Sequence, residues 1–158
     1  MKPITVILLV LAGSLLLLVG AFAVYFARGG QVLVWASVEK LGGGGSIEAD
    51  DNVAEQIAKM DFTFSPTPNL NVHFKGLGHK HWEPPFRDHF NKESMVFCDI
   101  SVTGKALRAI PSGNEFYDIT PEECQRQLIR EIQSRLSEEA ELQYTMDLFD
   151  WQTMPKKQ

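Results

Sequence analysis

The chain contains little cysteine and no surplus of positive charge, and it lacks the signature motifs of common enzymes. Two cysteines in 158 residues are too few for a disulfide scaffold, and a net charge of −5 excludes a strongly basic nucleic-acid binder. We find no GxSxG, Walker, CxxC, HExxH or EF-hand pattern, and no GxGxxG after an expected strand. We therefore expect a non-catalytic protein that does not bind nucleic acid, and we assign no catalytic residue and no definite cofactor.

Charge is also absent from residues 4–27, which form one uninterrupted apolar stretch. A helix over this stretch is about 36 Å long at about 1.5 Å per residue, which is enough to cross a bilayer with some tilt. Tyr25, Phe26 and Arg28 form an aromatic and cationic flank of the kind found at a membrane interface. The sequence thus predicts an anchor over residues 1–30 that contacts membrane lipid through residues 4–27.

A cleaved signal peptide is the competing interpretation, since Ala21-Phe22-Ala23 matches an A-x-A cleavage site. The apolar stretch exceeds the roughly 7–15 residues of a signal-peptide core and continues past the site, which favours retention. A short tail before a long apolar run is typical of a signal-anchor. We expect a single-pass protein whose C-terminal part lies in the periplasm or outside the cell.

Residues 31–46 combine a β-prone segment with the run GGGGS at Gly42–Ser46. Four consecutive glycines maximise backbone freedom, so the run predicts a flexible linker to a soluble domain at residues 47–158. The same string is also common in engineered linkers.

The remaining sequence predicts an α+β domain. Val96, Cys98, Ile100 and Val102 alternate with more polar residues, as expected for a strand with one buried face. Thr120-Pro121-Glu122-Glu123 has the N-cap, the proline and the capping-box glutamate of a helix start. We expect a helix near residues 50–60, hairpin strands at 61–64 and 70–74, strands at 95–102 and 106–110 divided by a turn at Gly104, and a helix from 120 to about 142. Two helices would then cover one face of a small antiparallel sheet.

The two cysteines, Cys98 and Cys124, are expected on facing apolar surfaces of the strand and the helix. In an oxidising compartment a disulfide between them would stabilise the domain by about 3 kcal/mol. Two buried thiols that behave as small hydrophobic residues are the alternative.

All the histidines of the chain lie in one stretch, at His73, His79, His81 and His89. Imidazoles are good ligands for zinc and copper, so a metal site formed by these four residues is a hypothesis for this stretch. Their spacing matches no established metal motif, and a solvated loop is the simpler interpretation.

The same stretch interleaves large aromatic and basic side chains around Pro84-Pro85, as surfaces for protein recognition often do. The candidate contact residues are His79, His81, Trp82, Phe86, Arg87 and Phe90. Aromatic residues that fold back into a small core are the alternative. Basic residues outnumber acids within 73–92, and acids outnumber basic residues within 115–150, so we expect the two segments at electrically opposite ends of the domain.

We expect a membrane-anchored protein whose exported domain binds another protein. This expectation rests on the predicted anchor, the flexible linker, the compact domain and the absence of enzyme motifs. An accessory subunit, an envelope assembly factor and an inhibitor or immunity-type protein all fit this description. A zinc or copper carrier or sensor that uses residues 73–89 is the second hypothesis, and an enzyme of unrecognised type is the third.

Overall fold

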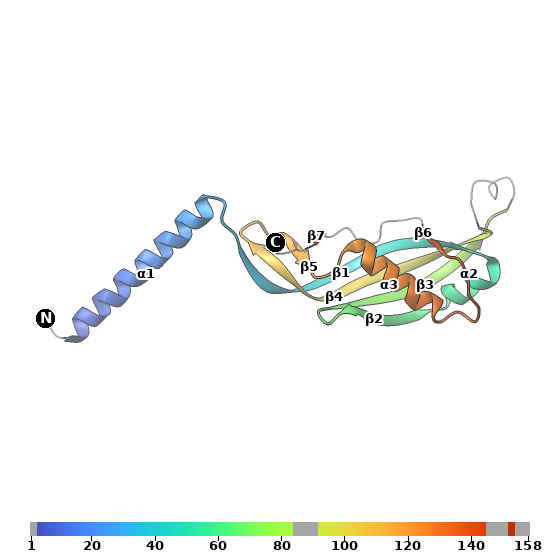
Figure 1. The fold of residues 1–158 in the computed structure, drawn as a ribbon, viewed down its shortest axis with the longest axis horizontal. Helices are drawn as coiled ribbons and strands as arrows, with labels where there is room; N and C mark the ends of the chain where they lie inside the picture. The colour runs from blue at the N-terminus through green and yellow to red at the C-terminus, as the bar shows by residue number, and fades with distance from the viewer. Residues whose placement is uncertain (1–2, 84–91, 145–151, 154–158) are drawn as a thin grey trace. The chain divides into compact units, whose positions relative to one another are not determined.

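The computed structural model describes residues 3–83, 92–144 and 152–153 (Figure 1). Its contacts divide the chain into two compact units, residues 1–34 with 108–114 and residues 35–107 with 115–158, which are described separately below. The elements are α1 (Pro3–Ala27), β1 (Val32–Ala49), α2 (Asp51–Ala58), β2 (Asp61–Thr67), β3 (Leu70–His81), β4 (Ser94–Ile110), β5 (Glu115–Tyr117), α3 (Pro121–Gln133), β6 (Gln143–Tyr144) and β7 (Gln152–Thr153).

The first unit contains the apolar helix α1. Ile4–Ala27 has a mean hydropathy of 2.8, and none of its most apolar window is buried. This helix is long and apolar enough to span a membrane, and a signal sequence near an N-terminus has the same properties. The prediction of a long apolar N-terminal helix is confirmed, and its membrane crossing stays a prediction.

The C-terminal end of α1 is closed by ordered backbone contacts. The Gly30 N–H donates to the Tyr25 carbonyl oxygen at 2.9 Å, and the Gly29 N–H donates to the Phe26 carbonyl oxygen at 3.0 Å. Gly29 has a φ of 81°, so these bonds form a Schellman motif that satisfies carbonyls left open at a helix end. The Tyr25 hydroxyl then donates to the Gln31 carbonyl oxygen at 2.8 Å. The helix therefore ends in a defined turn.

The strands form one sheet, with seven strands among the described residues. Its order is β2-β3-β4-β1-β6, with β5 beside β4 and β7 beside β5. The β2–β3, β3–β4 and β1–β6 pairs are antiparallel, while β5 and β7 are parallel. The predicted hairpin at 61–74 and the predicted strand at 95–102 are confirmed. The turn expected at Gly104 is wrong, because β4 continues through this residue to Ile110.

The flexible linker predicted within residues 31–46 is not confirmed. Residues 42–46 lie inside β1, next to β4 in the sheet, and Gly45 and Ser46 are buried. A Cβ atom added to Gly44 would lie 4.0 Å from the Cys98 carbonyl oxygen of β4. A strand needs a neighbouring backbone with which to form hydrogen bonds, and here β4 compensates for the glycines' lack of intrinsic strand preference.

Helices α2 and α3 pack against one face of the sheet, and together they form the hydrophobic core. Val53 and Ile57 of α2 and Leu128 and Ile132 of α3 are buried in one cluster with alternate residues of the central strands. The strand members include Leu70, Val72 and Phe74 of β3, Val96, Cys98, Ile100 and Val102 of β4, and Val38, Ile47 and Ala49 of β1. Figure 1 shows α3 running across the sheet. The prediction of an antiparallel sheet with two helices is confirmed, and this side is called the helix-covered face below.

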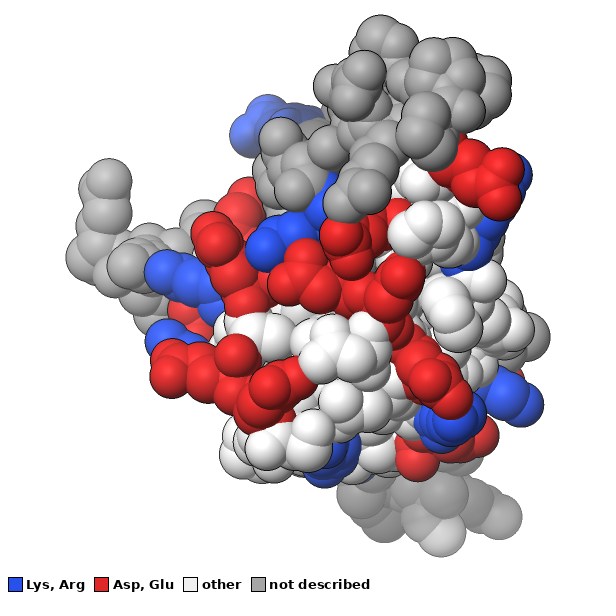
Figure 2. Space-filling model, turned by 90° about the vertical axis from the view of Figure 1, so that its right-hand side faces the viewer, with Lys and Arg blue, Asp and Glu red and all other residues white. Residues whose placement is uncertain are grey.

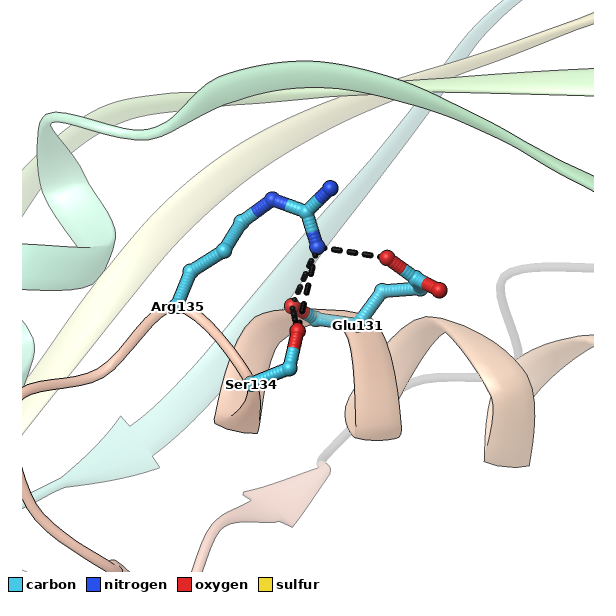
Figure 3. A network of polar contacts seen from close by, with 3 residues as sticks. All are labelled: Glu131, Ser134 and Arg135. Carbon is cyan, nitrogen blue, oxygen red and sulfur yellow. Dashed lines mark hydrogen bonds and ion pairs between the residues drawn. The ribbon is translucent and has the colours of Figure 1, made fainter.

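The start of α3 agrees with the sequence, but its end does not. The Thr120 hydroxyl oxygen accepts from the Glu123 N–H at 3.1 Å, as predicted, and the helix stops at Gln133 rather than near Leu142. Arg135 stabilises this end of the helix, because its guanidinium donates to the Glu131 carbonyl oxygen at 2.7 Å (Figure 3). The same guanidinium lies 4.0 Å from the centroid of the Phe62 ring of β2. This cation–π contact attaches the end of α3 to the sheet.

The connection between α2 and β3 is unusually close at Gly76. A Cβ atom at this position would lie 2.4 Å from the Ile57 carbonyl oxygen, and the Gly76 N–H donates to the Met60 carbonyl oxygen at 2.8 Å. The obstructing atoms belong to the backbone, which moves less easily than a side chain. Only glycine leaves the space for this contact.

We expect Gly76→Ala to destabilise the domain by about 1–3 kcal/mol, because the added methyl group forces the end of α2 away from β3. Gly44→Ala is the matched control, since its Cβ meets the nearest atom at ordinary contact distance, and it should change stability by less than about 0.5 kcal/mol. Urea unfolding of the two full-length variants, followed by tryptophan fluorescence, measures both. Equal destabilisation by the two substitutions would show that the contact at Gly76 is not a close one.

Candidate functional site

The candidate site lies where β3 ends beside α2, and an irregularity in β3 creates it. The pairing of β3 with β4 shifts by one residue between Gly76 and Gly78. Before the shift, Phe74 pairs with Ile100; after it, His79 pairs with Val96 and His81 with Ser94. Directly paired residues share a face, so the shift places His79 and His81 on the helix-covered face.

Asp51, the first residue of α2, connects the helix to this end of the sheet. Its Oδ1 accepts a hydrogen bond from the buried Ser94 hydroxyl and lies 2.8 Å from His81 Nδ1. The hydrogen bond from Ser94 and then that from His81 lower the pKa of the Asp51 carboxyl, with a further contribution from the nearby His79. The carboxylate is therefore ionised at neutral pH and orients the His81 imidazole.

The contacts of Asp51 do not make Ser94 a nucleophile. The Ser94 hydroxyl donates to the carboxylate, and its side chain is fully buried. An activated serine instead donates to an imidazole, which takes up its proton. The described arrangement thus joins a helix, a strand and an imidazole without the proton relay of a hydrolase.

His73 is separated from the other two described histidines. It pairs with Ser101, which lies on the sheet face opposite to Ile100, and His73 Nε2 lies 2.7 Å from Asp61 Oδ1. Within residues 3–83, 92–144 and 152–153 no group of three or more His, Cys, Asp or Glu side chains is arranged to hold a metal ion. His89 lies outside the described residues, so the four-histidine metal site stays a prediction without support from the described geometry.

The described part of the predicted contact surface is exposed and structured. His79 and Lys80 are exposed, and Trp82 is half-buried with the Lys80 ammonium 5.2 Å from its ring centroid. The backbone N–H of Trp82 donates to the backbone carbonyl oxygen of Glu93 at 2.9 Å, and this bond joins the two ends of the 82–93 connection. Phe86, Arg87 and Phe90 lie outside the described residues.

The basic and acidic segments do not lie at opposite ends of the domain, contrary to our expectation. His81 of the basic segment contacts Asp51 at the start of α2, and Lys92 Nζ lies 3.8 Å from Oδ1 of Asp50, the residue that precedes the helix. Glu138 of the acidic segment also reaches α2, where it accepts a hydrogen bond from Asn52. Figure 2, a view of the α2 end of the domain, shows many Asp and Glu side chains gathered there among a few Lys and Arg. The site is therefore a surface of mixed charge.

The two cysteines are buried, on β4 and on the first turn of α3. The described structure contains no disulfide between them, so their pairing stays a prediction. Burial, and secondarily the neighbouring Glu123 carboxylate, raises the pKa of the Cys124 thiol to about 12. A thiol with this pKa is protonated at neutral pH and is a poor nucleophile.

Sequence reasoning found the histidines and Trp82 but missed Asp51 and Ser94. An acidic residue such as Asp51 near the start of a predicted helix already has a structural explanation, and Ser94 precedes the apolar strand without any pattern that links it to a residue 43 positions earlier. No local signal joins the two residues, because the β3 irregularity and the packing of α2 bring them together. Comparisons of the chain with known protein families, curated proteins and solved structures found no match.

We expect Asp51→Asn to weaken the attachment of α2 most at neutral pH. A carboxyl whose folded-state pKa is lowered stabilises the fold above its unfolded-state pKa, and this stability is lost as the pH falls through the folded-state value. The difference in unfolding free energy between wild type and Asp51→Asn should therefore shrink below about pH 4.

Asp61→Asn is the matched control, because it removes the partner of His73 on the other face and involves no buried serine. In urea titrations of the full-length protein at pH 7, Asp61→Asn should lower the free energy of unfolding by less than Asp51→Asn does. A difference between wild type and Asp51→Asn that stays constant from pH 7 to pH 3 would contradict the assigned role of the carboxylate.

Proposed function

We propose that this chain is a single-pass membrane protein whose exported domain binds another protein. The observation that carries the proposal is the exposed apolar helix α1, which ends in an ordered turn and precedes a folded domain. Exposing this much apolar surface to water is unfavourable, and lipid removes that penalty. An accessory subunit, an envelope assembly factor or an inhibitor or immunity-type protein would have such an arrangement.

The geometry of α1 supports retention of the helix after export. Residues 21–23, the potential cleavage site, lie within regular helix, and the helix continues to Ala27. Backbone hydrogen bonds engage the residues immediately after this site, from Val24 to Gly30. A cut after Ala23 would remove most of the helix on which that turn is built.

The end of β3 supports a protein partner. Lys80 and Trp82 present a cation and an aromatic ring next to each other on one face of β3, and the exposed His79 and His81 lie on the other face of the same strand end. Aromatic and cationic side chains are enriched at the energetic centres of protein interfaces. The hydrogen bonds of Asp51 and Glu93 hold this end of the strand in place, which reduces the entropy lost on binding.

A photo-crosslinking amino acid placed at His79 or Lys80 of the full-length protein, in its native membrane, tests the proposal. We expect a discrete crosslinked product of reproducible mass at these positions. Charge reversal by Lys80→Glu on the crosslinker-bearing His79 variant should reduce its yield, because a rim charge contributes to the attraction of the partner.

Thr103 is the matched control position, because it is exposed on β4 next to the far end of β3, where it pairs with Asn71. A product of equal yield at Thr103 would indicate non-specific collisions. Failure to obtain any discrete product at His79 and Lys80 would refute protein binding through this surface.

A further inference from the structure

An apolar groove runs along one side of the C-terminal half of α1. It has a volume of about 760 Å³ and is a shallow groove that is open to the surroundings. Leu16, Gly20 and Val24 are four residues apart and share this side of the helix. Gly20 is part of the lining, and a Cβ atom added there would meet nothing within 4 Å, so a larger side chain at this position has room to enter the groove.

One wall of the groove is held in a fixed position by Tyr25. Its ring packs against Gly30, where an added Cβ atom would lie 2.5 Å from ring carbons. Its hydroxyl donates to the Gln31 carbonyl oxygen at 2.8 Å. The turn at Gly29 brings Gly30 back toward the helix and so completes the groove. This wall is preorganised, unlike the freely rotating side chains of an ordinary lipid-facing helix.

The lining of the groove is apolar along the helix and cationic at its end. Arg28 is the charged residue that lines it, and Tyr25 places the groove's end at the level expected for an interfacial aromatic ring. A second, parallel copy of this helix would bring a second Arg28 close to the first, and the two like charges would repel each other. An occupant with an apolar tail and an anionic head matches the lining.

We propose that this groove binds an anionic phospholipid, with one acyl chain over Gly20 and Ala21 and the phosphate beside Arg28. The inference rests on the proposed membrane anchoring and adds a specific ligand to it. Lipid bound in this way would stabilise the segment where the chain leaves the membrane, because the lipid would contact residues that form the turn after α1.

Native mass spectrometry of the full-length protein released from nanodiscs tests the site. The discs contain equal amounts of phosphatidylglycerol and phosphatidylcholine with identical acyl chains. We expect the wild type to retain one phosphatidylglycerol preferentially, and Arg28→Gln to reduce this preference about fivefold, the effect of one cation near an anionic lipid.

Two glycine variants separate a groove from a general lipid contact. Gly20→Leu fills the groove without a clash and should abolish retention of the lipid. Gly13→Leu also meets nothing within 4 Å but lies outside the groove, so it should retain lipid as the wild type does.

Three results would overturn the proposal. Equal retention of the two lipids by the wild type would indicate annular lipid only, and equal lipid retention by Gly20→Leu and wild type would exclude the groove. A dimer that Gly20→Leu abolishes would identify a second helix as the occupant. Failure of the protein to enter nanodiscs at all would instead contradict the membrane anchoring, and the lipid site with it.

Discussion

The uncharged stretch from Ile4 to Ala27 imposes the main physical constraint on this protein, because its apolar side chains are unfavourable in water. Most of its large apolar side chains are exposed in the described chain, as is typical of a membrane anchor or a signal sequence. The backbone of α1 is compatible with an apolar environment, because a helix satisfies its own hydrogen bonds and the turn at Gly29 and Gly30 satisfies carbonyls at its end. The turn therefore ends the helix without leaving these carbonyls unsatisfied.

Within the domain, the packing of the helices on one face of the sheet determines the geometry of the candidate surface at the end of β3. Helices α2 and α3 cover the buried residues of β3 and β4, and α2 approaches β3 so closely that Gly76 has no room for a side chain. The register shift that follows turns His81 toward Asp51 at the start of α2. Core packing and surface chemistry are therefore linked through a few residues of one strand.

The sequence predicted those elements whose signals are local. The alternation at Val96–Val102 and the capping residues at Thr120 each specify one element with little help from the rest of the chain. The glycines at residues 42–45 have no side chains whose pattern could predict a strand, and the pairing of β1 with β4 overrides their intrinsic flexibility. Asp51 and Ser94 meet only after the sheet and α2 have packed, which no spacing in the sequence encodes.

The mass of the protein extracted from its native membrane tests the central claim most directly. A retained anchor predicts a membrane-bound form in which residues 1–23 are still present. A mature, water-soluble form that begins at Val24 would contradict the account, because the domain would then leave the membrane and the lipid groove on α1 would not exist.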